Sequence, residues 1–426
     1  MPLTEADRTK ILNSIKKLVV ERHINVTNPG QDYTKWTSLV DERTPQLVKI
    51  EDTEEFEHAV EQLLVALGGS HTAFFQQRGA KVPPPHSINA TLRAIETRQG
   101  PRWMFLDVVE DGPAFRSGIR PGELLLAADG NPAMPPSQPG FRIGGVHELE
   151  IGTQGGDTRR VSVEVPDRQA KGRPPMVEPR SMSHRMLASD VGYIRIATFP
   201  GAVGRDFAKA LDIAIEELKA KGARRLIVDL RGNMGGGLGS LRLMSHLCAG
   251  KLEIGHSLTR RRLQKGYDRE KLIHIGKIPS SKLALLTMAL RFRFIQKDRS
   301  MVLVTEGLGE QPFHGNIALL VNEHSRSAAE MVASFAKDNG LAVVVGDKTP
   351  GEVLGAANFK LDGGYRLRMP VAGWYTWRGE CLEGKGVEPD VPVEMSPEAL
   401  ANGVDTQLDS ALDVLAKGLN AHSAAS

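Results

Sequence analysis

The sequence predicts a soluble α/β protein with more than one domain, and three features indicate this fold class. Continuous apolar runs at 191–196, 225–230 and 316–321 are typical of strands buried on both faces. An amphipathic pattern over 207–218 separates the first two runs, which predicts a right-handed β-α-β unit with parallel strands. The length of 426 residues exceeds one ordinary core and predicts two to three domains.

Composition and charge narrow the class of protein. The chain is 41% hydrophobic and 25% charged, and its net charge of +3 is too small to indicate a nucleic-acid partner. Cys248 and Cys381 form neither a disulfide framework nor a metal-ligand spacing. Residues 1–20 are charged and amphipathic rather than apolar, unlike a signal peptide, and no apolar run is long enough to span a membrane. We therefore expect a cytoplasmic protein, or a periplasmic or secreted one if a signal was removed.

Residues 1–80 are predicted to form a small helical domain. Apolar side chains share one helix face in two stretches, at Ile11, Ile15, Leu18 and Val19 and at Phe56, Val60, Leu63 and Leu64. The domain ends at a Gly68-Gly69 corner that is followed by Ser70 and His71. A lone histidine is usually a satisfied or surface residue, so Ser70 and His71 by themselves do not indicate a site.

Residues 83–167 are predicted to form a β domain after a proline cluster, with short strands near 103–109, 123–128 and 160–165. The motifs Asp111-Gly112-Pro113-Ala114, Ser117-Gly118-Ile119 and Pro121-Gly122-Glu123-Leu124 resemble the core signature of a PDZ domain, although Glu123 replaces the usual Asp. The resemblance implies that an edge stretch captures peptides by strand addition, and this stretch holds Ile88, Asn89, Ala90, Thr91 and Leu92. A PDZ-shaped spacer without peptide affinity is the alternative.

A Pro-, Arg- and Lys-rich linker at 168–184 leads to a core predicted over 185–396. Within this core, Arg231-Gly232-Asn233-Met234-Gly235-Gly236-Gly237 follows a strand, and its glycines allow close approach of backbone N–H groups to an anion. A phosphate cradle or a plain loop are alternatives, and the absence of a following Lys-Ser/Thr argues against nucleotide binding. Residues 397–426 are predicted to hold a final helix and a tail.

Residues 256–300 interrupt the core pattern. This stretch holds twelve Lys or Arg residues against three acidic ones, together with the apolar run 283–290. A basic amphipathic stretch is suited to an anionic surface or an acidic partner. A solvated insertion or a lid beside the active site is the alternative interpretation.

Ser327 lies between the strand at 316–321 and a helix predicted from Ala328 to Phe335. Backbone N–H groups at such a corner point outward, and the helix dipole favours negative charge there. A nucleophilic serine requires this environment because its attack generates an oxyanion. A simple helix N-cap is the alternative interpretation of Ser327.

Four segments together resemble the C-terminal-processing (tail-specific) serine peptidases, which share a core with the tricorn protease. They are the Asp229–Gly236 loop, Asn322 with Ser325–Glu330, the turn 346–351, and the block 383–390. The resemblance implies a crotonase/ClpP-like ββα-spiral core preceded by a PDZ-like domain, with no metal or organic cofactor. It also implies hydrolysis of peptide bonds through an acyl-enzyme on Ser327.

One departure from the family pattern decides the predicted mechanism. Many family members use a lysine base directly after the Gly-x-x-Thr-x-Gly turn, where this chain has Glu352. A carboxylate cannot replace a neutral amine there, and Lys348 and Lys385 are displaced from the motif position.

The tricorn-like branch of the family offers the alternative mechanism. By that resemblance His71 is the base, Ser70 bridges it to Glu383, and the oxyanion hole is formed by N–H groups of Ala328 and of Gly235 or Gly236. Ser70-His71 could otherwise be a structural polar pair, and Glu383 a surface acid. A non-catalytic peptide- or ligand-binding protein on the same scaffold is the second hypothesis, motivated by the missing lysine.

Overall fold

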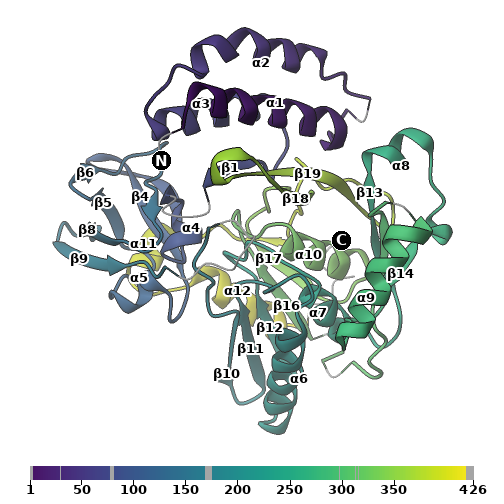
Figure 1. Ribbon diagram of the computed structural model, residues 1–426. Helices are drawn as coiled ribbons and strands as arrows, with labels where there is room; N and C mark the ends of the chain where they lie inside the picture. The colour runs from purple at the N-terminus through teal and green to yellow at the C-terminus, as the bar shows by residue number, and fades with distance from the viewer. Residues whose placement is uncertain are drawn as a thin grey trace.

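The computed structural model describes residues 3–28, 30–76, 81–167, 175–296, 298–311, 313–314 and 316–418. It shows a mixed α/β protein in which several sheets meet (Figure 1). No helix in these ranges is long and apolar enough to cross a bilayer.

The central sheet carries the predicted parallel strands. Its order is β10 (Met182–Ala188), β11 (Val191–Ile196), β12 (Arg225–Asp229), β16 (Ile317–Val321), β17 (Val343–Gly346) and β20 (Val391–Pro392). Only β10 runs antiparallel to its neighbour β11. The predicted parallel β-α-β unit is confirmed, because α6 (Arg205–Ala220) connects β11 to β12. The predicted linker ends inside β10, and its residues 168–174 lie outside the described ranges.

Helices cover both faces of the central sheet, which explains why its inner strands β11, β12, β16 and β17 are almost entirely buried. Helices α6, α7 (Gly239–Leu247) and α10 (Ala328–Asp338) pack on one face, against side chains such as Ile194, Val228 and Leu319. The predicted C-terminal helix, α12 (Thr406–Ala416), packs on the other face through Ala411, Val414 and Leu415. Residues 419–426 of the predicted tail lie outside the described ranges.

A second sheet lies between this core and the N-terminal helices (Figure 1). It contains β1 (Ala73–Gln76), β19 (Tyr365–Thr376), β13 (Glu253–Thr259), β15 (Met301–Val304), β14 (Ile273–Ile275) and β18 (Gly355–Lys360). The predicted helices form as α1 (Glu5–Arg22), α2 (Thr34–Leu47) and α3 (Thr53–Val65). Their buried faces share one hydrophobic cluster with Phe74, Tyr365, Leu367 and Met369. The N-terminal helices are therefore a layer on β19 and have no separate core.

The basic stretch 256–300 is only partly an insertion. Strand β13 holds its first residues and β14 lies in its middle. Both belong to the second sheet, where β13 pairs with β15 and β19, and β14 pairs with β15. Between them, the chain forms α8 (Arg260–Lys265) and the short helix η1 (Arg269–Lys271). After β14 it forms α9 (Lys282–Leu290) and η2 (Arg291–Gln296).

A small β unit, defined here as residues 84–165, has its own hydrophobic cluster around Phe105, Phe141 and Leu149. Its elements are α4 (Pro84–Ser87), β3 (Ala90–Thr97), β4 (Gly100–Val108), α5 (Pro113–Arg116), β5 (Leu124–Ala128), β6 (Asn131–Pro132), β7 (Phe141–Arg142), β8 (Val146–Gly152) and β9 (Thr158–Glu164); β2 (Lys81–Val82) pairs with β7. The chain returns to this unit at α11 (Pro397–Ala401), where Met395 and Leu400 pack on Met104 and Leu124.

Candidate active site

Ser327 occupies a strained corner between β16 and α10. Its φ of 55° and ψ of −114° lie in a region that non-glycine residues rarely adopt. The preceding loop is fixed to the segment that follows β12, because Ser325 Oγ donates to the Leu230 carbonyl at 2.8 Å and Asn322 Oδ1 accepts from the Gly232 amide at 3.0 Å. Strain that the surrounding structure holds in place is a feature of functional sites.

Glu330 holds this corner in place, a role that was not predicted from the sequence. Its side chain is fully buried and accepts the Ser327 amide at 3.0 Å. It also accepts Thr349 Oγ1 at 2.7 Å and the amides of Gly351 and Glu352 at 2.7 and 2.8 Å. Burial raises the pKa of the Glu330 carboxyl, and these donors act in the opposite direction. The Ser-x-x-Glu spacing of a capping box is the sequence signal that marks this residue.

Ser70, His71 and Glu383 come together although 313 residues separate Ser70 from Glu383 in sequence. The Ser70 amide and hydroxyl contact Glu383 Oε1 and Oε2 at 2.8 and 3.1 Å, and Ser70 Oγ lies 2.6 Å from His71 Nδ1. A carboxylate only accepts, so the Ser70 hydroxyl donates to Glu383 and His71 Nδ1–H donates to Ser70. This direction leaves the lone pair on His71 Nε2, which is the arrangement that a general base requires.

The segment Glu352–Val353 connects the Glu383–Ser70–His71 hydrogen-bond chain, called the relay here, to the corner at Ser327. Glu383 Oε2 also accepts the Val353 amide at 2.9 Å, directly after the Glu352 amide that Glu330 holds. Burial, followed by the positive charges of Arg368 and Arg326, lowers the pKa of His71 to about 3, so the imidazole is neutral at pH 7. Among the hydrogen bonds of the described residues, none joins Ser327 to His71 directly. Catalytic hydrogen bonds are often long in unliganded enzymes and shorten when substrate binds.

The glycine loop after β12 lies against Ser327. A Cβ atom added to Gly235 would meet Ser327 Cβ at 2.6 Å and the Ala328 amide nitrogen at 3.0 Å, so only glycine fits there. The Gly235 amide donates to Asn233 Oδ1 at 2.7 Å and is therefore occupied. Within the described part of the chain, the Gly236 and Ala328 amides have no such bond. Ala328 directly follows Ser327, and Gly236 directly follows Gly235, which lies against Ser327.

Comparison with known proteins agrees with the resemblance of the core to C-terminal-processing serine peptidases. Residues 190–393 match the family model of peptidase family S41. We call residues 190–393 the S41 segment. The chain is 24% identical over 355 residues to the carboxy-terminal processing protease CtpA of Bacillus subtilis, with 82% of this chain and 66% of that protein covered. It is also 24% identical over 407 residues to a putative tricorn protease homolog 2 of Streptomyces coelicolor, with 90% and 30% covered.

Solved structures show the same fold. The photosystem II D1 C-terminal processing protease superimposes with a TM-score of 0.56 at 18% identity, covering 96% of this chain and 97% of that one.

Among the sequence relatives, the chain spans just under two thirds of CtpA and under one third of the tricorn homolog. What those larger proteins do as wholes is not carried over by these matches.

The position where many S41 peptidases have a lysine base holds an ion pair in this chain. Glu352 pairs with Arg326 at 2.6 Å, which occupies the carboxylate beside Ser327. Lys348 is more than half exposed and pairs with Glu388 at 2.5 Å, and Lys385 is exposed. Neither lysine is available as a buried amine base. Within the described residues, no group of three or more His, Cys, Asp or Glu side chains could hold a metal ion.

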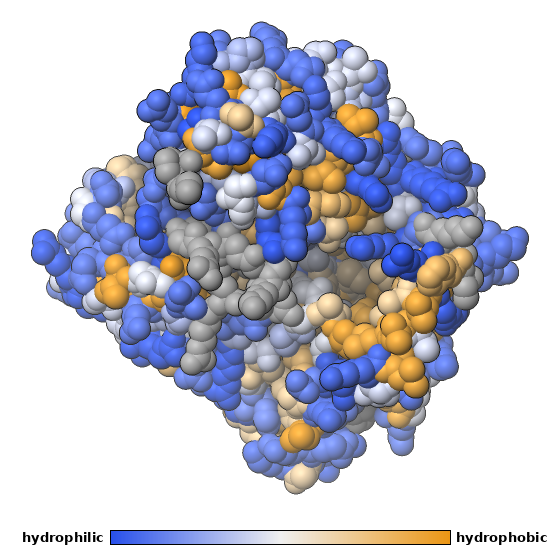
Figure 2. Space-filling model, viewed as in Figure 1, coloured by the Kyte–Doolittle hydropathy of each residue, from blue (hydrophilic) through white to orange (hydrophobic). Residues whose placement is uncertain are grey.

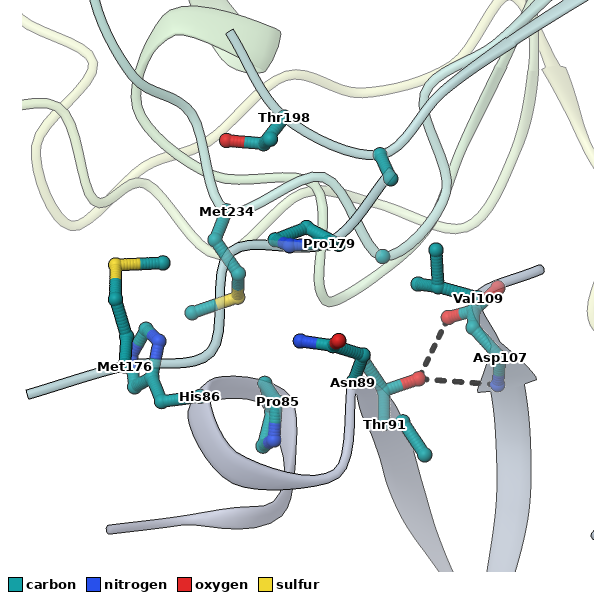
Figure 3. A pocket seen from close by; sticks show the side chains of 13 residues that line it. Pro85, His86, Asn89, Thr91, Asp107, Val109, Met176, Pro179, Thr198 and Met234 are labelled. Carbon is teal, nitrogen blue, oxygen red and sulfur yellow. Dashed lines mark hydrogen bonds between the residues drawn. The ribbon is translucent and has the colours of Figure 1, made fainter. Parts of the chain in front are cut away.

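The residues predicted to bind peptides lie in a nearly closed seam between the small β unit and the S41 segment. Each of Ile88, Asn89, Ala90, Thr91 and Leu92 is at most 3% exposed. Asn89, Ala90 and Thr91 line a cavity of about 20 Å³, room for about one water molecule, opposite Gly232 and Met234 of the glycine loop (Figure 3). His324 Nε2 donates to the Leu92 carbonyl at 3.2 Å, and the side-chain Nδ2 of Asn89 donates to the Val177 carbonyl at 2.9 Å. In this conformation the stretch is not free to pair with a peptide.

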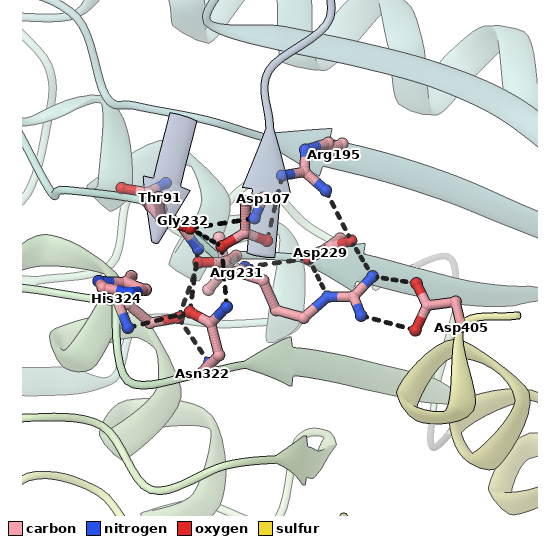
Figure 4. Close-up of polar contacts among 12 residues, drawn as sticks. Thr91, Asp107, Arg195, Asp229, Arg231, Gly232, Asn322, His324 and Asp405 are labelled. Atoms are coloured by element: carbon pink, nitrogen blue, oxygen red, sulfur yellow. Dashed lines mark hydrogen bonds and ion pairs between the residues drawn. The ribbon is translucent and has the colours of Figure 1, made fainter. Parts of the chain in front are cut away.

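Buried charges hold the seam closed (Figure 4). Asp107 of β4 accepts Thr91 Oγ1 at 2.6 Å and Asn322 Nδ2 at 2.9 Å, and it lies 3.5 Å from Arg195. Arg195 also contacts Asp229 at 3.3 Å, which continues the network into the core. The small β unit therefore contacts two loops that precede Ser327 in sequence: the glycine loop and the Asn322 loop.

Proposed function

We propose that the protein is a serine-type peptidase that hydrolyses peptide or protein substrates, with Ser327 as nucleophile and His71 as base. The observation that carries this proposal is the Glu383–Ser70–His71 relay, whose direction leaves His71 Nε2 free to accept a proton. The glycine loop supports it, because the free amides of Gly236 and Ala328 are suited to an oxyanion.

The reaction follows from these groups. Ser327 Oγ attacks the peptide carbonyl while its proton passes to His71 Nε2, and the carbonyl oxygen becomes an oxyanion held by the two amides. Collapse breaks the C–N bond, and His71 returns the proton to the leaving amine. Water then attacks the acyl-enzyme with His71 again as base, releasing the second product and restoring Ser327. Glu383 stabilises the imidazolium through Ser70.

We also propose that the small β unit is PDZ-like and that the core is the ββα spiral of the crotonase type. The support is the motif at 111–124 and the parallel central sheet beside Ser327. A PDZ-like unit captures a peptide by adding a strand to its edge, and this would require the seam to open at Ile88–Leu92.

Labelling the folded protein with a serine-directed phosphonate and mapping the adduct tests the proposal. We expect the adduct on Ser327, and Ser327→Ala should abolish both labelling and peptide hydrolysis while its thermal midpoint stays near that of the unsubstituted protein. Ser325→Ala is not a suitable control, because Ser325 Oγ holds the loop before Ser327 in place. The matched control is Ser334→Ala, on helix α10 after Ser327. Absence of labelling in a folded sample would favour the non-catalytic binding protein.

A further inference from the structure

Helix α9 and η2 expose a stripe of large apolar side chains. Leu283, Leu286, Leu290 and Phe294 are 68%, 55%, 43% and 63% exposed. They recur every three or four residues, so they lie on one face of the helical segment. The opposite face holds Met288 and Phe292, which pack on the main hydrophobic cluster. Figure 2 shows the stripe as an apolar band over α9.

The charges around this stripe have one sign. Lys282 precedes it, and Arg291 and Arg293 are exposed within its second half. The sequence has no acidic residue between Glu270 and Asp298. Asp298 pairs with Arg262 at 2.5 Å and Asp268 with Lys271 at 3.0 Å, whereas Glu270 is exposed.

We propose that α9 and η2 bind this protein to an anionic lipid surface, with the apolar stripe entering the headgroup region and the basic side chains meeting lipid phosphates. Leu and Phe on one face, with Lys and Arg beside them, is the pattern of helices that lie in a membrane interface. Basic side chains near an anionic leaflet each strengthen binding. The proposal does not depend on peptidase activity.

Self-association explains the stripe less well. Two copies packed antiparallel along α9 would place Lys282 of one copy near Arg291 and Arg293 of the other, and parallel packing would also oppose like charges. A specific protein interface covers about 800 Å² on each partner. One short helix with four exposed apolar side chains offers far less, unless other surfaces contribute.

Vesicle flotation tests the proposal with the full chain carrying Ser327→Ala. We expect it to float with vesicles of phosphatidylcholine and phosphatidylglycerol but not with phosphatidylcholine alone, and binding should weaken as salt is raised. Arg291→Gln with Arg293→Gln should reduce partitioning roughly 30-fold, the equivalent of two basic contacts. Leu286→Ser with Phe294→Ser should reduce it at least as much. The matched control is Ile213→Ser with Val146→Ser, which changes side chains 58% and 65% exposed on α6 and β8 and should have no effect.

The depth at which the apolar stripe enters the bilayer is measured with Phe294→Trp, whose added tryptophan fluorescence should be quenched by lipids brominated on their acyl chains. Circular dichroism confirms that each variant is folded. The proposal is overturned if anionic vesicles do not bind the protein, or if the α9 variants bind like the control pair. It is also overturned if Leu286→Ser with Phe294→Ser instead removes a concentration-dependent oligomer without lipid, which would assign the stripe to a second copy of the chain.

Discussion

At the scale of single residues, the proposed chemistry depends on where the hydrogen bonds among Glu383, Ser70 and His71 place their protons. Glu383 is 8% exposed and accepts the Ser70 amide, the Ser70 hydroxyl and the Val353 amide. It thus fixes both the imidazole and the segment next to Ser327. The sequence motifs singled out Ser70, His71 and Glu383, but not the hydrogen bond to Val353, because backbone contacts leave no mark in residue type.

The low pKa of His71 predicts the pH dependence of turnover. A histidine whose pKa lies below 6.5 stays neutral as the pH falls, so we expect the acidic limb of kcat/KM well below pH 6.5. Arg368→Gln removes one of the two positive charges that lower this pKa. The limb should then move to higher pH, by up to about one unit.

The control for this measurement is Arg366→Gln, two residues earlier on β19, which removes a charge that is not among the causes that lower the pKa of His71. Identical pH profiles for Arg368→Gln and the unsubstituted protein would show that the charge of Arg368 does not contribute to the low pKa of His71. A limb that persists in His71→Ala would contradict the assignment of the base itself.

At the scale of elements, the N-terminus of α10 and the turn 349–352 act as one unit through Glu330. Removing its carboxylate leaves four donors without their acceptor: three backbone amides and the Thr349 hydroxyl. We expect Glu330→Ala to lower the free energy of unfolding by about 3 kcal/mol, because each buried unsatisfied donor costs about 1–3 kcal/mol and the site relaxes in part. kcat should fall while KM changes little, since Ser327 is displaced and the substrate contacts remain.

Glu330→Gln is the matched variant, because it keeps the shape and one acceptor oxygen and should lose less of both quantities. Urea unfolding and steady-state kinetics measure the two effects. An unchanged urea midpoint for Glu330→Ala would mean that the carboxylate does not hold this corner together.

At the scale of the whole molecule, buried neutral histidines predict acid sensitivity. Burial is the first cause that lowers the pKa of His23, His86 and His256 to about 4, and His71 behaves likewise. The unfolded chain takes up protons at the ordinary value of 6.5, whereas the folded protein does not. The free energy of unfolding should therefore be constant above about pH 6.5 and fall from there toward pH 4, by at most about 1.4 kcal/mol per pH unit for each histidine.

Urea midpoints at pH 8, 6.5 and 5 test this expectation. His256→Gln should flatten the slope, because one buried titrating group is gone, whereas His58→Gln on the exposed face of α3 should leave it unchanged. Equal midpoints at pH 8 and pH 5 would contradict the prediction.

The sequence by itself determined the features that depend on local pattern. The apolar runs at 191–196 and 316–321 could only be strands buried on both faces, and the serine between strand and helix followed from the change of period at Ala328. The presence of Glu352 where many family members have a lysine could also be recognised from the sequence, because the motif specifies the usual residue type at that position. These features need only neighbours in the chain.

Only the tertiary structure decided the features that depend on distant contacts. The helical layer shares its core with β19, more than 300 residues away, so periodicity could not show that it lacks a core of its own. The stretch Ile88–Leu92 has the pattern of an open edge, yet Asp107, Asn322 and His324 close it from two elements. Burial and charge pairing are properties of the assembled chain, because they arise from what the fold places opposite each side chain.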